Sequence, residues 1–286
     1  MFAGTTVPGP SGETCQTRRQ KPEVASKDSL FCLFQRLFPQ HLVSRIAGAL
    51  ANVRQPWIKN LLISAFIRRF AIDLEEAESA DKNTYPSFNA FFTRALKPDA
   101  RSIDSGLETV ISPADGMVSQ IGSIREGKLV QAKGIDYRLN DLLADAPLAK
   151  TFDKGFFATI YLSPRDYHRV HMPFAGQLIR TTYLPGRLFS VNAATTKALD
   201  NLFTRNERLV CQFDSPAGPF VLVLVGATLV AGIETVWEGQ YAPASAKYRD
   251  HRPDTLHFEK GEEIGRFKFG STVILLLPPQ AAIDGE

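Results

Sequence analysis

Three short segments of the chain hold residue types that could carry out acyl chemistry. They are Ser112-Pro113-Ala114-Asp115-Gly116, the stretch from Tyr161 to His171, and Phe269-Gly270-Ser271-Thr272. Together they supply a carboxylate (Asp115), two imidazoles (His168 and His171) and a hydroxyl (Ser271) that directly follows a glycine (Gly270). This set of groups is suited to a chain that attacks its own backbone and makes a catalytic group from a serine.

The chemistry would begin at the Gly270-Ser271 bond. A glycine leaves its carbonyl open to attack and permits strained backbone angles. Attack by the Ser271 hydroxyl gives an ester, elimination gives dehydroalanine, and hydrolysis leaves a pyruvoyl group with loss of ammonia. The first step needs a base for the hydroxyl proton, and His171 held by Asp115 could serve.

Each segment also has a simpler interpretation. Ser271 could be only the first residue of an apolar strand, and Asp115 could accept backbone N–H bonds in a turn. His168 and His171 lie between Pro164 and Pro173, which predicts a short turn or a single helical turn with both imidazoles on one side. They could be a structural pair or half of a metal site, but no third His or Cys lies nearby, so we expect no metal.

The elements that position these residues are mostly strands. After Val110 the pattern predicts no βαβ alternation and favours an α+β fold with a mostly antiparallel, barrel-like or sandwich-like core. Expected strands are Gly116–Ile124, Leu129–Gln131, Phe156–Leu162, Gln177–Tyr183, Arg208–Phe213, Phe220–Val225, Leu229–Thr235 and Ser271–Leu277. Expected helices are Asp73–Lys82, Ser87–Leu96, Asp136–Leu143 and Ala193–Leu202.

Composition excludes several classes of protein. The chain has 286 residues and a formal net charge of only +3, which gives no overall nucleic-acid signature. Its 3 cysteines are widely spaced and form no CxxC pair, so neither a disulfide framework nor a zinc site is expected and a reducing compartment fits best. Residues 1–28 are polar, lack the apolar core of a signal peptide, and are expected to be a disordered tail.

Residues 29–70 differ from the rest of the chain. Apolar residues recur there at helical spacing, and the segment holds six basic residues and no acidic one, so the remainder sums to 3 − 6 = −3. It could be a helical bundle with a solvated basic rim. We favour amphipathic helices that lie on anionic lipid in the plane of the interface, because the segments are too short and too charged to span.

The order of these motifs resembles the bacterial, pyruvoyl-dependent phosphatidylserine decarboxylase family. The resemblance extends over about residues 60–278 and departs from the usual pattern at Phe269, where the family has Leu. Besides the three segments above, the matching pieces are Phe91 to Pro98, Leu184 to Asn192, Asn206-Glu207-Arg208, Val225 to Thr228 and Ile233 to Trp237.

The resemblance implies roles for individual residues. Asp115, His171 and Ser271 would form the self-cleavage relay, and Ser271 would become the pyruvoyl cofactor that forms a Schiff base with phosphatidylserine. His168 would act in the decarboxylation to phosphatidylethanolamine, and Asp166 would support its loop. Cleavage between Gly270 and Ser271 would give fragments 1–270 and 271–286, and the family suggests a homodimer.

The resulting domain plan has three parts: the tail 1–28, a helical membrane-associating segment 29–82, and a decarboxylase domain 83–286. A peripheral location on the cytoplasmic side of the cell membrane would suit a lipid substrate. Two rival functions stay open. A serine hydrolase could use the same Asp, His and Ser, although it would lack a GxSxG elbow. A non-enzymatic lipid-binding protein could use residues 29–70 alone.

Overall fold

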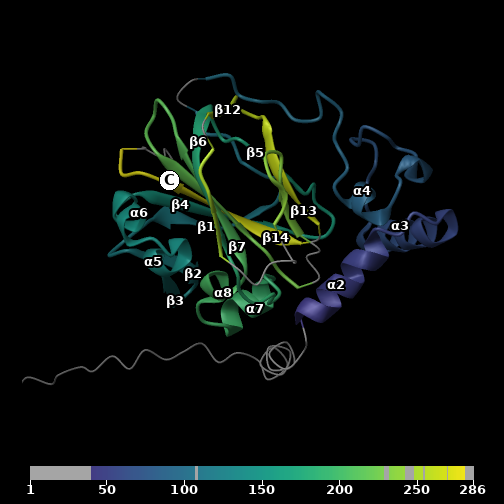
Figure 1. Ribbon diagram of the computed structural model, residues 1–286, viewed down its shortest axis with the longest axis horizontal. Helices are drawn as coiled ribbons and strands as arrows, with labels where there is room; N and C mark the ends of the chain where they lie inside the picture. The colour runs from purple at the N-terminus through teal and green to yellow at the C-terminus, as the bar shows by residue number, and fades with distance from the viewer. Residues whose placement is uncertain are drawn as a thin grey trace, which may run out of the picture.

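The protein has an α+β fold whose sheets are antiparallel throughout the part described (Figure 1). The computed structural model describes residues 40–106, 109–228, 232–241, 248–253, 255–268 and 270–280. The strands are β1 Met117–Ser123, β2 Lys128–Ala132, β3 Ile135–Arg138, β4 Phe156–Leu162, β5 Arg169–His171, β6 Gly176–Leu184, β7 Arg208–Asp214, β8 Phe220–Val225, β9 Gly232–Thr235, β10 Gly239–Gln240, β11 Arg249–His251, β12 Leu256–Phe258, β13 Glu263–Lys268 and β14 Ser271–Leu277.

The strands form three sheets. The largest has the order β1-β4-β14-β8-β7-β6-β11, with β12 also paired to β6. A second sheet has the order β10-β9-β13-β5, and β2 pairs with β3 alone. The predicted α+β class and mostly antiparallel pairing are confirmed. The predicted barrel is not confirmed. Within the described residues no pairing joins β1 to β11, so the large sheet stays open.

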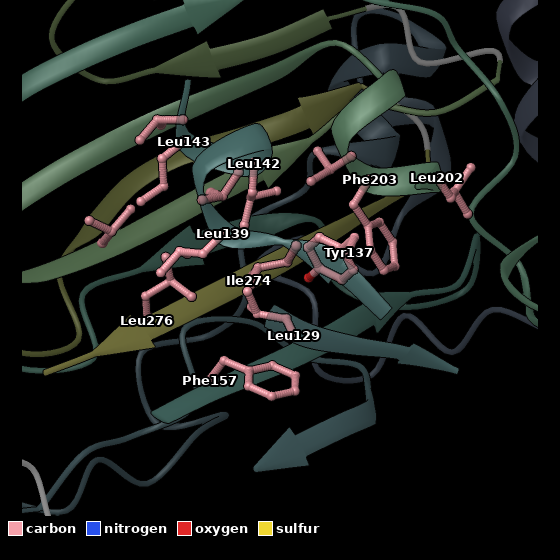
Figure 2. Packing of buried hydrophobic residues seen from close by; sticks show 14 of the residues in the cluster. Leu129, Tyr137, Leu139, Leu142, Leu143, Phe157, Leu202, Phe203, Ile274 and Leu276 are labelled. Carbon is pink, nitrogen blue, oxygen red and sulfur yellow. The ribbon is translucent and has the colours of Figure 1, made fainter. Parts of the chain in front are cut away.

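Both faces of the large sheet are buried at its central strands. Along β14, Ile274 and Leu276 belong to one apolar cluster, whereas Val273, Leu275 and Leu277 belong to another. Side chains alternate between the faces of a strand, so a strand buried on both sides reads as an unbroken apolar run. The first cluster includes side chains of α5 and α8 (Figure 2). The second includes side chains of β5, β9 and β13, so it joins the two larger sheets.

Two longer helices, α2 and α3, lie to one side of the sheets in Figure 1. The helical spacing noted in residues 29–70 is confirmed in its described part by α2 and α3. Within the described chain no helix combines the length and apolarity needed to cross a bilayer. The amide N of Leu188 donates to Oε1 of Gln40, which ties α2 to the sheet body. The helices are α2 Gln40–Ala51, α3 Pro56–Phe70, η1 Lys82–Thr84 (a 3-10 helix), α4 Phe88–Phe92, α5 Leu139–Leu143, α6 Ala146–Thr151, α7 Ala193–Ala198 and α8 Leu202–Arg205.

Two helix predictions were wrong because local turns interrupt them. Asp136–Leu143 begins as strand β3, since Gly134 with φ of 77° permits a tight turn that pairs β3 with β2. Ala193–Leu202 splits into α7 and α8, and Asn201 between them has φ of 58°. The left-handed backbone at Asn201 ends one helix before the next begins.

The region before the first strand also differs from expectation. Residues 73–82 form turns rather than a helix, and Ala77 instead makes an isolated bridge to Leu96. The Asp73 side chain accepts the Glu75 amide at 2.8 Å, a local bond that competes with helix formation. Ser87 caps α4 as predicted, with Oγ accepting the Ala90 amide, but the helix ends at Phe92. Predictions for residues 1–39, 229–231 and 281–286 lie outside the described residues.

Candidate active site

The three segments singled out in the sequence meet around the end of β4. Tyr161 of β4 pairs with Met117 on one side and with Thr272 on the other. The turn that contains Asp115 is also bound to the histidine segment, because the His171 amide donates to the Pro113 carbonyl at 2.8 Å. Residues that are more than a hundred positions apart in the sequence therefore share one region, which supports their use in one site.

Ser271 is the first residue of β14 and is fully buried opposite Leu162. Its hydroxyl makes no hydrogen bond within the described chain. A buried polar group without a partner costs about 1–3 kcal/mol, so this hydroxyl is held at a cost to stability. Gly270 is not among the residues with positive φ, so the strained backbone expected there is not found. A Cβ at Gly270 would have only an ordinary contact of 3.8 Å, with the Leu162 carbonyl. Phe269 lies outside the described residues.

His168 is fully buried immediately before β5. Its ring packs 4.1 Å from the ring of Phe92, and Nδ1 donates to the Asp166 carbonyl at 2.7 Å. Burial lowers the pKa of His168 to about 3, so the ring is neutral near pH 7. Nε2 then carries an open lone pair, and within the described residues nothing donates to it. His168 is therefore a buried neutral imidazole whose Nε2 is free to accept a hydrogen bond.

Asp166 holds the loop that carries His168. Its side-chain Oδ2 accepts the Ser163 amide at 2.7 Å, and its own amide donates to the Ser163 carbonyl at 3.0 Å. This reciprocal pair closes the turn that follows β4. The arrangement fits the supporting role expected for Asp166.

His171 has both ring nitrogens occupied. Nδ1 donates to the Gly261 carbonyl at 2.8 Å, and the Tyr167 hydroxyl, 3.0 Å away, donates to Nε2. The two rings are stacked with centroids 5.6 Å apart. The prediction that His168 and His171 share a helical turn is wrong, because residues 169–171 form strand β5. Successive side chains on a strand point to opposite faces, so an extended backbone does not put residues three apart on one side.

Asp115 lines the same cavity as His171, but its side chain is bound to another residue. The Arg101 guanidinium donates to its Oδ2 through Nε at 3.0 Å and through Nη2 at 2.7 Å. The same Nη2 donates to Glu76 at 2.8 Å. Asp115, Tyr167 and His171 line a cavity of about 410 Å³, whereas Ser271 and His168 are not among its lining residues. The structure thus brings the predicted relay residues into one region but does not join Asp115 to His171 by a hydrogen bond.

The sequence did not point to two side chains that bind the predicted relay residues: Arg101, which binds Asp115, and Tyr167, which binds His171. Arg101 lies in a loop with no motif of its own, and only its distance in space from Asp115 reveals it. Tyr167 could have been found, because it precedes His171 by four residues inside the segment already singled out. Its pKa is raised to about 12, chiefly by burial, so it stays a hydrogen-bond donor at neutral pH.

Comparison with known proteins gives a consistent result. A family model described as phosphatidylserine decarboxylase matches residues 88–285, and a second model, described as PSD, matches residues 30–71. The chain is 55% identical over 259 residues to a phosphatidylserine decarboxylase proenzyme of Alcanivorax borkumensis, covering 88% of each chain. Proenzymes of the same name from Bordetella pertussis and Stutzerimonas stutzeri are 54% and 50% identical, over 89% and 88% of this chain and 88% and 87% of their own lengths.

Proposed function

Because this chain belongs to the phosphatidylserine decarboxylase family, we propose that it converts phosphatidylserine to phosphatidylethanolamine with a pyruvoyl group made from Ser271. The observation that carries the proposal is the Gly270-Ser271 bond, with its buried and unpaired hydroxyl, in a chain about half identical to proenzymes of that name. The word proenzyme in those names supports processing of the chain into fragments 1–270 and 271–286.

The residues around Ser271 suit such a group. A pyruvoyl group at this position would bind the substrate amine and take up the electron pair that is released when CO₂ departs. His168 offers an unpaired Nε2 on a neutral ring, which can accept a hydrogen bond from a reacting group, and we assign it to the decarboxylation step. In the uncut chain, the side chains of Ser271 and His168 are both fully buried from water.

We assign the removal of the Ser271 hydroxyl proton to His171, with Asp115 as the group that orients its ring. Their shared region and the bond between the His171 amide and the Pro113 carbonyl support this assignment. For this step the hydrogen bond between Tyr167 and His171 and the one between Arg101 and Asp115 must both break. In the uncut chain these bonds occupy the His171 and Asp115 side chains.

The test of the function is the mass of the purified protein before and after borohydride treatment. We expect two chains, with a pyruvoyl-blocked fragment that begins at residue 271 and gains the mass of a reduced carbonyl. Ser271→Ala should abolish both the splitting and the decarboxylation of phosphatidylserine. An unsplit wild-type chain that still decarboxylates this lipid would refute the mechanism, and an unsplit chain with hydrolase activity would favour the rival function.

The helices α2 and α3 are proposed to rest on the membrane that carries the substrate. Leu42, Ile46 and Leu50 form a stripe at four-residue spacing on α2 and are 56%, 60% and 46% exposed. On α3, Trp57 and Leu61 are 67% and 64% exposed. Large apolar side chains in such a stripe are typical of helices that lie in a lipid interface.

The basic residues of α2, α3 and the loop between them differ in exposure. Arg45, Arg54, Arg68 and Arg69 are exposed, whereas Lys59 is buried and donates to the Asn83 carbonyl, so it does not contribute to the surface. The exposed residues can attract anionic lipid by about 1 kcal/mol each. The family resemblance suggests a homodimer, which stays a prediction.

Vesicle sedimentation tests the membrane proposal. We expect the protein to sediment with anionic vesicles, less with neutral ones, and to come off in part at high salt, because salt screens charge over about 8 Å. Leu42→Ser combined with Ile46→Ser should weaken binding to both vesicle types. Equal binding to both types at low salt would mean that the arginines face only solvent, and no binding to either would refute the proposal.

A further inference from the structure

Ser271 and Glu207 lie in one row across the large sheet, with Gly226 between them. The neighbouring row consists of three paired residues, one from each strand: Thr272 of β14, Val225 of β8 and Arg208 of β7. One residue further along, the Gly226 amide donates to the Glu207 carbonyl at 2.9 Å. Neighbouring strands are about 4.8 Å apart, so the backbones at Ser271 and Glu207 are separated by about 10 Å.

The two side chains face the same side of the sheet. Val273, two residues after Ser271, and Leu209, two residues after Glu207, belong to the same apolar cluster. Because side chains alternate along a strand, Ser271 and Glu207 point toward that cluster too. The residue between them is a glycine, so no side chain separates the hydroxyl from the carboxyl.

The Glu207 side chain lies over Gly226, on the path toward Ser271. A Cβ at Gly226 would stand 2.9 Å from Cγ and 3.0 Å from Oε1 of Glu207. Oε1 is also the carboxyl oxygen that has no hydrogen-bond partner within the described chain. Glu207 is 1% exposed and Ser271 is 0% exposed. An unpaired carboxyl oxygen is therefore buried in the gap that the glycine leaves beside an unpaired hydroxyl.

The side chains on either side of Glu207 in the sequence hold the fold together through hydrogen bonds, whereas Oε1 of Glu207 makes none within the described chain. The Asn206 side chain donates to the Phe189 and Gly226 carbonyls. The Arg208 guanidinium donates to the carbonyls of Asp141 and Leu142 at 2.7 Å each. In contrast, Glu207 has only one bond from a side chain among the described residues, with the Tyr183 hydroxyl donating to Oε2 at 3.1 Å.

The surroundings make Glu207 a strong base for a carboxylate. Burial raises its pKa to about 7, and the hydrogen bond from Tyr183 lowers it in part. Among the described residues, Arg249 acts electrostatically on Tyr183, and the Tyr241 ring lies 6.2 Å from the Tyr183 ring. Near neutral pH the carboxyl exists in both forms, so it can take up a proton and release it again.

We propose that Glu207 is a second proton-transfer residue of self-cleavage, which removes the Cα proton of residue 271 after the ester has formed. The inference rests on the proposed function, because it requires an ester between the Gly270 carbonyl carbon and the Ser271 Oγ. His171 is assigned to the hydroxyl proton of the first step. The less acidic Cα proton of the second step still needs a base, and Glu207 provides one away from water.

The step balances without any other reactant. The Glu207 carboxylate takes the Cα proton, and the electron pair of the C–H bond forms a double bond between Cα and Cβ of residue 271. The bond between Cβ and Oγ breaks, and its electron pair leaves on Oγ, which becomes part of the Gly270 carboxylate. Residue 271 is then dehydroalanine, and water converts it to a pyruvoyl group with release of ammonia.

Glu207→Gln tests the assignment, because the amide keeps the size of the side chain but is not a base. The variant should form the ester and stop there, so its mass should stay that of the 31.6 kDa chain in neutral buffer. Hydroxylamine, which cleaves esters, should then release a fragment 271–286 that begins with serine rather than with a pyruvoyl group. Glu207→Asp, which retains a carboxylate, should still form the pyruvoyl group, at least tenfold more slowly than wild type.

Two results would overturn the inference. One is a Glu207→Gln variant that forms the pyruvoyl fragment at the wild-type rate. The other is a folded variant that stays uncut even in hydroxylamine, since Glu207 would then act before the ester. The wild-type chain, tested first, separates this inference from the proposed function: a wild type without splitting or carbonyl refutes the function itself, whatever the variant does.

The pH dependence provides a readout that a merely structural glutamate would not change, even where Glu207→Gln fails to fold. The rate of wild-type splitting should rise as the pH passes through about 7, because Glu207 becomes a carboxylate. Tyr183→Phe removes the hydrogen bond that lowers the pKa of Glu207, so it should move the midpoint of this rise to higher pH. A midpoint that Tyr183→Phe leaves unchanged would contradict the inference.

Discussion

The surroundings of Ser271 and the cavity beside it hold similar residue types in opposite states. Ser271, His168 and Glu207 are buried, and each has a polar atom that no described residue pairs. Around the cavity, Asp115 is bound by Arg101, and both ring nitrogens of His171 have partners. A hydrogen-bonded group is held in place, whereas a buried unpaired one keeps its reactivity at a cost of about 1–3 kcal/mol.

This difference indicates how the chain can complete its folding before self-cleavage begins. Ser271, His168 and Glu207 are already in place in the uncut chain, and each keeps an unpaired polar atom. The groups assigned to begin the reaction, Asp115 and His171, are held by Arg101 and Tyr167. We infer that exchange of these partners, rather than arrival of a new residue, starts the self-cleavage.

The largest expected effect would separate the two histidines. His171→Ala should block self-cleavage, with a loss of at least a hundredfold in rate, because general-base catalysis contributes about 10²–10⁴. His168→Ala should still split, at least in part, but should decarboxylate poorly. Mass spectra and lipid turnover, measured on the same preparations, would distinguish the two. Identical behaviour of both variants would contradict the assignment of His171 to self-cleavage and His168 to decarboxylation.

A matched pair of variants sharpens the comparison at the cavity. Asp115→Asn should resemble His171→Ala, because an imidazole without an orienting carboxylate is a poor base. Arg101→Gln removes the bidentate partner that occupies Asp115, so we expect splitting to persist and to become several-fold faster. The rate of splitting in freshly synthesised protein measures both. Slow splitting in Arg101→Gln would show instead that Arg101 positions Asp115 for the reaction.

Phe92→Ala should break the burial of His168. Phe92 is 1% exposed and packs on His168, and loss of a buried phenylalanine costs about 3–5 kcal/mol. The space admits water, so we also expect the pKa of His168 to rise toward its ordinary value and turnover to fall at acidic pH. Phe91→Ala is the control, because within the described chain its ring contacts Phe66, Tyr85, Phe88 and the Arg94 guanidinium, and no ring contact with His168 is found. Equal pH profiles for the two variants would contradict this reasoning.

A smaller effect concerns stability in acid. His168 has a pKa of about 3 in the folded chain against 6.5 ordinarily, so between these values the unfolded chain binds more protons. The folded state therefore loses stability as the pH falls below 6.5, by up to about 1.4 kcal/mol per pH unit from this residue. In an uncut Ser271→Ala background, His168→Gln should flatten this fall in the free energy of unfolding, measured by urea denaturation. Parallel curves with and without His168 would argue against the lowered pKa.

Much of the fold could be predicted because the central strands of the large sheet are buried on both faces. β4, β8 and β14 read as apolar runs, and their limits agree with the expected Phe156–Leu162, Phe220–Val225 and Ser271–Leu277. The strands β5, β10, β11, β12 and β13 were missed, and all but β13 are only two or three residues long. The four-residue strand β3 was assigned to a helix instead. Such pieces become strands through their neighbours, and no local periodicity marks them.

The site was predictable as a set of residues but not as a set of bonds. The sequence places Asp115, His168, His171 and Ser271 in motifs, and the strand pairings bring these motifs together. It could not reveal that Arg101 reaches Asp115, because that contact depends on the path of a loop. Nor could the sequence reveal which polar side chains are buried away from water. Glu207 stands out only once it is known to lie in one row of the sheet with Gly226 and Ser271.

The position of β14 has a consequence for the life of the cleaved protein. The strand lies in the interior of the large sheet, hydrogen-bonded to β4 and to β8, and all seven of its residues are buried. Burial of its five aliphatic side chains alone is worth on the order of 10 kcal/mol. A cut before Ser271 would therefore release no peptide. The two fragments would behave as a permanent heterodimer, in which the smaller subunit could be exchanged only by unfolding the larger one.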